Sequence, residues 1–221
     1  MAARRPRSRR ERAGNGSVAS TRVGTETAKR VIETARKVLM DKGYAQFSMR
    51  NVAAAAGMHL NNVQYYFRTR DDLIRALMRD IEARYGAAYE QCLAAASPDR
   101  LARFKAVLKF NLEDTGKAET RRLFIQLWAL LDRLHGESGR MLEQFYEMDL
   151  AVLCQQISEL DRRCPAKEVR RRAALLAAMI EGLIVVRGAH SPSAAEAKRL
   201  TARAQALGTH IALGLFASRA K

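Results

Sequence analysis

Several residue types that mark other classes of protein are scarce in this chain of 221 residues. Only three residues are cysteine (Cys92, Cys154 and Cys164), and they show neither a CxxC pair nor a Cys/His spacing suited to a metal. We therefore expect reduced thiols, not a disulfide framework or a zinc site. No apolar run approaches the ~18 residues of a membrane span, and the N-terminus is rich in arginine without the apolar stretch of a secretory signal. These absences predict a cytoplasmic protein without a membrane partner.

Motifs of catalysis and of cofactor binding are also missing. The sequence has no G-x-S-x-G, no phosphate-binding loop and no HExxH. The four histidines, His59, His135, His190 and His210, are scattered and indicate neither a metal site nor a catalytic triad. We expect a protein that is not an enzyme and that holds no cofactor or metal.

Proline is rare as well, with four residues in the chain, and β-branched residues are few. Alanine, leucine, arginine and glutamate, which favour the helix, are abundant. The composition therefore predicts an all-α fold, and the length is sufficient for one or two domains with a sizeable core.

Acidic residues are scarce in one part of the chain only. Residues 1–70 hold 15 Lys or Arg against 4 Asp or Glu, a net charge of +11, while the other 151 residues carry only +5 of the total of +16. Neutralisation of nucleic-acid phosphates requires such a concentration of positive charge.

Residues 1–22 contribute much of that charge. They are rich in Arg, Ser and Gly and have no periodic apolar pattern, so we predict a disordered basic arm. The arm either lies along the phosphates or in the minor groove of DNA, or it is a solvated tail. The arginines that would make the DNA contacts are Arg4, Arg5, Arg7, Arg9, Arg10 and Arg12.

Two short helices are predicted further on, within residues 48–67 (SMRNVAAAAGMHLNNVQYYF). Ser48 is a suitable N-cap for the first helix, whose apolar residues recur at helical spacing. Gly57 can adopt the left-handed conformation that ends a helix and turns the chain. The second helix begins near His59 and has Val63 on its inner face. This arrangement is typical of a helix-turn-helix.

The outer face of the second helix is polar and carries no charge. Amides and phenols on such a face can hydrogen-bond to base edges and phosphates. The alternative is an ordinary helical hairpin in a structural domain. The outward residues are Leu60, Asn61, Asn62, Gln64, Tyr65 and Tyr66.

Residues 28–73 resemble the DNA-binding domain of the tetracycline-repressor (TetR) family of transcription factors. The shared pattern has a Gly-aromatic pair after the first helix, a Ser cap, a V-A-x-x-A-G turn, an aromatic-Phe pair and a basic residue before Asp-Leu. In this sequence these features are Gly43-Tyr44, Ser48, Val52-Ala53, Ala56-Gly57, Tyr66-Phe67, Arg70 and Asp72-Leu73. Three positions depart from the family's habit: His59 replaces the usual Ser, Gln64 a frequent Tyr and Arg70 a common Lys.

The resemblance implies a three-helix DNA-binding domain at residues 23–70, between the arm at 1–22 and a helical effector-binding and dimerisation domain at 71–221. It also implies that the amides of α-helical residues 61, 62 and 64 read bases, while tyrosines and Arg70 hold phosphates. The predicted DNA contacts are Ser48, Arg50, His59, Leu60, Asn61, Asn62, Gln64, Tyr65, Tyr66 and Arg70.

Apolar periodicity predicts seven longer helices besides these two short ones. The first starts at Thr25 or Thr27 and ends near Asp41. Asp71 can cap the next long helix, and Pro98 suits the first turn of the one after it. The six later helices are predicted at residues 71–96, 98–113, 118–135, 138–163, 166–188 and 193–217.

The end of the chain carries features of a dimer interface. Residues 180–183, Ile-Glu-Gly-Leu, resemble a signature in the C-terminal half of TetR-family proteins, whose last two helices usually pair with their copies. Small residues in the last helix permit close helix approach and so favour a homodimer. Packing within one subunit is the alternative. The stripe consists of Ala204, Gly208, Ile211 and Leu215.

Aromatic and methionine side chains at helical spacing either line a ligand cavity or form a plain core. The family resemblance favours the cavity. Glu181 is unusual because it is a carboxylate in an apolar run; it pairs either with a cationic ligand beside Trp128 or with an arginine or helix edge. The candidate pocket residues are Phe104, Phe124, Trp128, Met141, Phe145, Met148, Met179 and Glu181.

Together these features predict a TetR-like, sequence-specific regulator that binds a palindromic double-stranded DNA operator as a homodimer. The resemblance implies a repressor that a small-molecule effector releases from its operator. Two other functions stay open: non-specific binding of nucleic acid by a basic protein, and a helical ligand carrier or enzyme. The uncharged outer face argues against the first, and the lack of a catalytic constellation argues against an enzyme.

Overall fold

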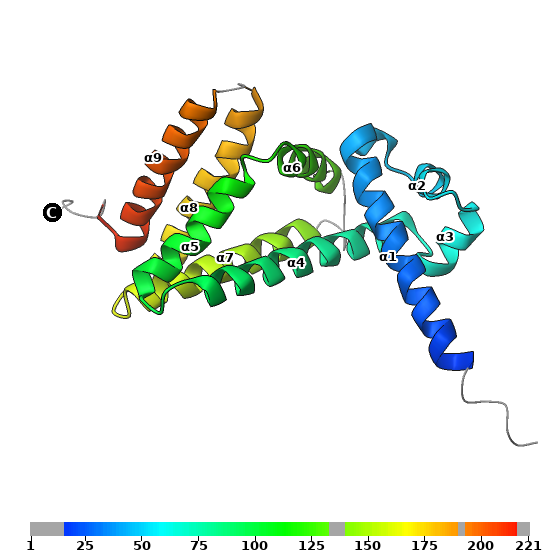
Figure 1. Ribbon diagram of the computed structural model, residues 1–221, viewed down its shortest axis with the longest axis horizontal. Helices are drawn as coiled ribbons and strands as arrows, with labels where there is room; N and C mark the ends of the chain where they lie inside the picture. Colours follow the sequence, from blue (N-terminus) through cyan, green and yellow to red (C-terminus); the bar gives the residue numbers. More distant parts are fainter. Residues whose placement is uncertain (1–15, 133–139, 190–192, 216–221) are drawn as a thin grey trace, which may run out of the picture.

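The computed structural model describes residues 16–132, 140–189 and 193–215, with side chains except at residues 16–23, 141, 142 and 189 (Figure 1). This part of the chain is helical and contains no strand, which confirms the predicted all-α class. Its elements are α1 Gly16–Lys42, the 3₁₀ helix η1 Tyr44–Gln46, α2 Met49–Ala55, α3 Leu60–Tyr66, α4 Arg70–Ala95, α5 Arg100–Asp114, α6 Ala118–Leu131, α7 Arg140–Leu160, α8 Ala166–Ala189 and α9 Ala194–Leu213.

The first helix begins earlier than predicted. α1 starts at Gly16 and not at Thr25 or Thr27, so residues 16–22 of the predicted arm are helical. No proline occurs between Pro6 and Pro98, and a helix that has formed extends at little cost where nothing interrupts it. The arginines predicted to contact DNA from the arm lie outside the described residues.

Side-chain caps determine where α4 and α9 begin. Thr69 caps α4 in place of the predicted Asp71: its hydroxyl accepts the Asp72 N–H at 3.1 Å, and the Asp72 carboxylate accepts the Thr69 N–H at 3.0 Å. Ser193 and Glu196 form the same reciprocal pair at the start of α9. Each pair satisfies backbone donors that the end of a helix leaves free.

Other helix ends differ from the predictions by a few residues. Asp99 caps α5 by accepting the Ala102 N–H at 2.8 Å, so Pro98 precedes this helix and does not lie in its first turn. α9 ends at Leu213, before the predicted end at 217, because Gly214 has a φ of 69° and turns the chain. The predicted last residue of α6, residue 135, and the predicted first residue of α7, residue 138, lie outside the described residues.

Two clusters of buried apolar side chains hold the helices together. The first, which we call the proximal core, joins α1, α2, α3, α4 and α6 and also includes Phe145 of α7 and Ile184 of α8. The second, the distal core, lies among α5, α7, α8, α9 and Tyr89 of α4. The proximal core therefore extends across the domain boundary that we predicted at residue 70.

α6 connects the two parts of the molecule, and it lies beside α1 in Figure 1. Its apolar residues, such as the fully buried Leu127, belong to the proximal core. Two polar contacts add to this packing: the Gln126 side-chain oxygen accepts the Tyr44 N–H at 3.0 Å, and Glu119 forms an ion pair with Arg36 of α1. α6 thus fixes the position of α1 and of the short helices that follow it relative to the rest.

Arg187 joins three helices from inside the apolar run of α8. Its side chain is buried, and one guanidinium nitrogen donates to the Leu112 carbonyl at 2.6 Å and to the Thr115 hydroxyl at 2.7 Å. The other terminal nitrogen donates to the Thr201 hydroxyl of α9 at 2.7 Å. These bonds satisfy an acceptor that the end of α5 leaves free and tie that end to α8 and α9.

The small residues predicted for the dimer interface face inward. Ala204 and Gly208 are buried, and a Cβ atom at Gly208 would lie 2.8 Å from Leu108 Cδ2. The close approach is therefore between α9 and helices of the same subunit, as in the alternative that the sequence left open. Ile211 is half-buried against the distal core, while Leu215 is exposed. These placements correct the prediction for all but Leu215.

Replacing Gly208 with leucine should destabilise the subunit itself. The new side chain would have to displace Leu108, Leu176 and Met179, and overpacking of this kind costs about 1–3 kcal/mol. We expect a lower Tm in thermal denaturation. The matched control is Gly86→Ala in α4, where an added Cβ meets no atom within 4 Å and should leave Tm unchanged or raise it. An unaltered Tm for Gly208→Leu would contradict the packing described here.

Candidate nucleic-acid interface and ligand cavity

α2 and α3 form a tight unit, and two residues set its geometry. Ser48 caps α2 as predicted, with its hydroxyl accepting the Asn51 N–H at 3.2 Å. Gly57 has a φ of 64°, a conformation that strains residues with a side chain. The Met58 N–H then donates to the Ala53 carbonyl at 2.9 Å and closes the turn. α3 follows directly, in the geometry expected for the second helix of a helix-turn-helix.

α3 buries one side and exposes the other. Val63 is fully buried in the proximal core, whereas Asn61, Asn62 and Gln64 are exposed. Tyr65 is 82% exposed, an unusual degree for a large aromatic side chain. The three amides and this phenol are therefore accessible to a partner molecule. We call these four residues the reading face.

Leu60 and Tyr66 have a different environment from the rest of the predicted outer face. Both are only partly exposed, because they pack against the proximal core. The Tyr66 ring lies near α1, with Cε1 3.9 Å from the position of a Cβ atom on Gly24. It also meets Tyr65 edge-on, with the ring centroids 5.2 Å apart. These two side chains hold α3 against the proximal core.

Arg70 makes contacts inside the domain. Its Nε donates to the Phe47 carbonyl at 3.1 Å, and its guanidinium lies 5.8 Å from the centroid of the Phe47 ring. It thus ties the start of α4 to the loop before α2, while its predicted contact with phosphate stays a prediction. Arg50 and His59 are exposed, and so is Arg68, which sequence reasoning missed although it follows the aromatic-Phe pair directly.

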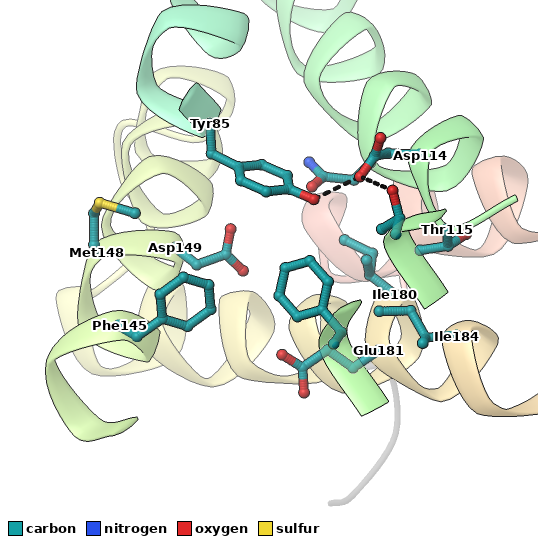
Figure 2. Close-up of a pocket in the computed structure, with 12 residues that line it drawn as sticks. Tyr85, Asp114, Thr115, Phe145, Met148, Asp149, Ile180, Glu181 and Ile184 are labelled. Carbon is teal, nitrogen blue, oxygen red and sulfur yellow. Dashed lines mark hydrogen bonds between the residues drawn. The ribbon is translucent and has the colours of Figure 1, made fainter. Parts of the chain in front are cut away.

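A cavity lies where α4, α5, α6, α7 and α8 meet (Figure 2). Its empty space is about 490 Å³, including the part open to solvent. Four predicted pocket residues line it: Phe124, Phe145, Met148 and Glu181. Sequence reasoning missed the other lining residues, which are Tyr85, Asn111, Asp114, Thr115, Thr120, Asp149, Ile180 and Ile184.

The remaining predicted pocket residues do not line this cavity. Phe104 is fully buried in the distal core, and Met179 packs against α9. Trp128 contacts the cavity residue Phe124, with ring centroids 6.1 Å apart, but does not itself line the cavity. The Met141 side chain lies outside the described residues. The pattern of aromatic and methionine residues identified buried helix faces but did not separate filled core from cavity wall.

Asp114, at the end of α5, is the polar centre of one cavity wall. Its carboxylate accepts hydrogen bonds from the hydroxyls of Tyr85 at 2.6 Å and Thr120 at 3.2 Å. The Lys117 ammonium lies 2.9 Å from its other oxygen and balances the charge. Burial, with the nearby Asp114 charge, raises the pKa of Tyr85, so the phenol remains a donor. These contacts join α4, α5 and α6 around the cavity.

For two further carboxylates in the cavity, the hydrogen-bond partner among the described residues is a tyrosine. Asp149 accepts a hydrogen bond from Tyr89 at 2.9 Å, and Glu181 accepts one from Tyr146 at 2.9 Å. Burial raises the pKa of Asp149. Burial also raises the pKa of Glu181 to about 7, an effect that the Asp149 charge strengthens and the Tyr146 hydrogen bond weakens. The arginine or helix edge predicted as a partner of Glu181 is therefore replaced by a phenol.

Other candidate sites are absent from the part of the chain that the structure describes. Its His, Cys, Asp and Glu side chains form no group suited to a metal ion. Among the same residues, no helix is long and apolar enough to cross a membrane. The cysteines Cys92, Cys154 and Cys164 are free and half-buried.

Comparison with known proteins identifies the helix-turn-helix. Residues 31–77, which include α2, α3 and parts of α1 and α4, match the model of the bacterial regulatory proteins of the tetR family. The chain belongs to the TetR family. The HTH-type transcriptional regulator BetI of Yersinia pestis (strain Pestoides F) is 28% identical to it over 167 residues, 73% of this chain and 82% of BetI.

Solved structures share the fold of this TetR-family chain. FadR from Bacillus subtilis, in complex with stearoyl-CoA, has a TM-score of 0.67 at 14% identity, with coverage of 82% of this chain and 97% of FadR. AibR, in complex with isovaleryl coenzyme A and operator DNA, has a TM-score of 0.56 at 17% identity, with coverage of 70% and 83% respectively. The family membership expected from the sequence is confirmed, and the protein is a DNA-binding transcriptional regulator.

Glu181 should make the stability of this TetR-family protein depend on pH near neutrality. Its pKa of about 7 in the folded state exceeds the ordinary value of 4.5. The protonated side chain therefore contributes stability that is complete below about pH 4.5 and is lost as the pH rises through about 7. We expect the Tm of the wild type to fall more between about pH 5 and about pH 8 than that of Glu181→Gln, which has no proton to lose.

The groups that face Glu181 also bear on this measurement. Tyr146 and Asp149 come from α7, Asp114 from α5 and Tyr85 from α4. The tyrosines have raised pKa values and stay protonated in this range, so the difference between wild type and Glu181→Gln isolates the carboxyl group. Glu147→Gln is the control, because this exposed carboxylate pairs with an arginine of α8 outside the cavity. Equal pH slopes for wild type and Glu181→Gln would contradict the prediction.

Proposed function

We propose that this TetR-family protein is a repressor that binds a palindromic operator as a homodimer and releases it when a small molecule occupies the cavity. The observation that carries the DNA-binding part is the reading face of α3, which exposes three amides and a phenol above the buried Val63. A side-chain amide can form two hydrogen bonds with adenine in the major groove.

The charge around α3 supports sequence-specific binding over binding by charge alone. The reading face itself carries no charge, while the exposed Arg50 and Arg68 flank it at the start of α2 and after the end of α3. Arginines at such positions suit phosphates, which fix orientation without reading sequence. Asn61, Asn62 and Gln64 are left to distinguish one base pair from another.

Dimerisation is supported by an exposed apolar face on α8 and α9, which lie at the end of the molecule away from α3 (Figure 1). Ala178 and Gly182 are exposed on α8, and an added Cβ at Gly182 would meet no atom within 4 Å, so a second helix can approach closely. Exposed apolar patches mark interaction sites. This dimer face includes Leu175, Val185, Val186, Leu207, Leu213 and Leu215.

Release from DNA is supported by the helices that form the cavity walls. Tyr85 lies on α4, whose first residue, Arg70, holds the loop before α2. Phe124 lies on α6, which contacts the DNA-binding helices through Gln126. A ligand that favours another position of α4 or α6 shifts α3 in both subunits, so that the two copies no longer match successive major grooves. Such couplings are typically ~1–3 kcal/mol.

Selection of genomic fragments with the purified full-length protein tests the proposed function directly. We expect enrichment of one palindromic sequence whose half-sites lie about one helical turn apart. Bound fragments without a common sequence would instead support the non-specific alternative.

Two variants should separate base reading from phosphate binding on the selected operator. Asn62→Ala should lose ~1–3 kcal/mol of binding free energy and relax the base preference at one position in each half-site. Arg50→Ala should weaken binding to all sequences alike and reduce the slope of log K against log salt by about 1 per subunit. Titration of single-base operator variants at several salt concentrations measures both effects. If Asn61, Asn62 and Gln64 can all become alanine without a change of preference, α3 does not read the operator.

Charges on the dimer face should abolish dimerisation. The double variant Leu175→Glu, Val186→Glu would bury two carboxylates per subunit in an apolar contact, which is unfavourable without partners. We expect monomers in sedimentation velocity and a large loss of operator affinity. Ala87→Glu, which adds a carboxylate at an exposed position of α4, is the control and should remain dimeric. A wild type that is monomeric at micromolar concentration and still binds the palindrome tightly would exclude the homodimer.

A further inference from the structure

Two carboxylates of the cavity have no cationic partner among the residues that the structure describes. Asp149 of α7 and Glu181 of α8 point toward the same space (Figure 2). None of the described residues that line the cavity is lysine, arginine or histidine. Lys117 pairs with Asp114 from outside, but no cation contributes to the pKa shift of Asp149 or Glu181. Asp149 and Glu181 therefore share a partly desolvated space to which the described side chains supply no counter-ion.

Aromatic rings form much of the remaining wall. Phe124 lies between Tyr85 and Phe145, with ring centroids 5.9 Å and 6.0 Å away. Trp128 packs against Phe124, with ring centroids 6.1 Å apart. The faces of such rings are electron-rich and attract cations, most strongly where water is excluded. This observation is independent of the carboxylates, and it indicates the same sign of charge in the ligand.

Ligands of other charge classes fit these walls less well. An anion would be repelled by Asp149 and Glu181 and would find no cation on the described walls. A neutral apolar ligand would remove water from both carboxylates without replacing its hydrogen bonds, which is costly for a buried charge. A cation offsets the two carboxylates and uses the rings at the same time.

We propose that the effector is a compact organic cation, an ammonium with small apolar substituents, whose charge lies between Asp149 and Glu181 and whose substituents contact Phe124 and Phe145. This inference rests on the proposed function in one respect, since it takes the cavity to be the effector site. The ligand is compact because only part of the empty space of about 490 Å³ is enclosed by the protein and the rest is open to solvent.

Three probes of nearly the same shape and different charge test the ligand class. They are tetramethylammonium (positive), neopentyl alcohol (neutral) and pivalate (negative), titrated calorimetrically into the full-length protein at constant ionic strength. We expect tetramethylammonium to bind at least about tenfold more tightly than either of the others, a difference of about 1.4 kcal/mol. Equal or tighter binding of neopentyl alcohol or pivalate, or no binding of any probe, overturns the inference.

Variants in the cavity show whether the carboxylates carry the binding. Glu181→Gln and Asp149→Asn should each weaken tetramethylammonium binding about tenfold and leave the affinity for neopentyl alcohol unchanged or higher. Glu147→Gln, in which the lost carboxylate lies outside the cavity, should behave as wild type. If Asp149→Asn fails to fold, Glu181→Gln still decides, because glutamine retains an oxygen that can accept the Tyr146 hydrogen bond. Unchanged tetramethylammonium affinity in Glu181→Gln would refute the assignment.

Operator binding in the same preparations keeps this inference distinct from the proposed function. Tetramethylammonium should release the wild type from its operator and should release Glu181→Gln only at a higher concentration. If the wild type binds a specific operator but none of the probe selectivity is found, the ligand class is wrong and the regulator stands. If the probes bind as expected but no specific DNA is found, the proposed function is wrong and the ligand class stands.

Discussion

Burial of the apolar face of α6 is the constraint on which the rest of this structure depends. Leu127 is fully buried in the proximal core, where α6 packs against α1 and η1, and full burial of one leucine stabilises a fold by about 1.5–3 kcal/mol. On the next turn of the same helix, Phe124 forms part of the cavity wall. The helices that carry the reading face therefore do not form an isolated module. Their position is set by α6, which also forms part of the cavity wall.

The features that could be predicted from the sequence are those with local signals. Ser48, Gly57 and Val63 specify a cap, a turn and a buried face within 16 residues of one another, and the structure has all three. The helical conformation of each segment could be predicted equally well, because composition and apolar periodicity are properties of single segments. The predicted positions of the helix ends were less accurate. At the start of α4, for example, both Thr69 and Asp71 are residue types that cap helices well. The reciprocal hydrogen bonds between Thr69 and Asp72 make Thr69 the cap.

The direction in which the C-terminal helices face could not be read from the sequence. α9 carries small apolar residues on one side and larger ones on another, and either side could have met a partner subunit. Packing against Leu108 of α5 decides that Gly208 faces inward and leaves Leu207 and Leu213 outside. In the same way, Phe104 and Phe124 have similar sequence surroundings, but one fills the distal core and the other faces the cavity.

The polar residues of the cavity other than Glu181 escaped prediction because their partners are distant in the sequence. Tyr85 bonds to Asp114 across 29 residues, and Tyr146 bonds to Glu181 across 35. Neither pair has a spacing that marks it as a unit. Arg70 is a related case: the family pattern predicts a basic residue there, but its bond to the Phe47 carbonyl, 23 residues earlier, is visible only in the folded chain.

α4 is an unbroken helix, and this gives it the mechanics of a lever. Its 26 residues span about 39 Å at a rise of about 1.5 Å per residue. Tyr85, at the cavity, lies about 22 Å from the start of the helix on the same rise, so a tilt of about 5° at that point displaces Arg70 by about 2 Å. In the proposed homodimer, the same tilt in both copies would change the separation of the two α3 helices by about 4 Å, slightly more than the ~3.4 Å between neighbouring base pairs. In the proposed mechanism, a helix of this length would convert a small angular change at the ligand into a displacement of about one base-pair step at the DNA.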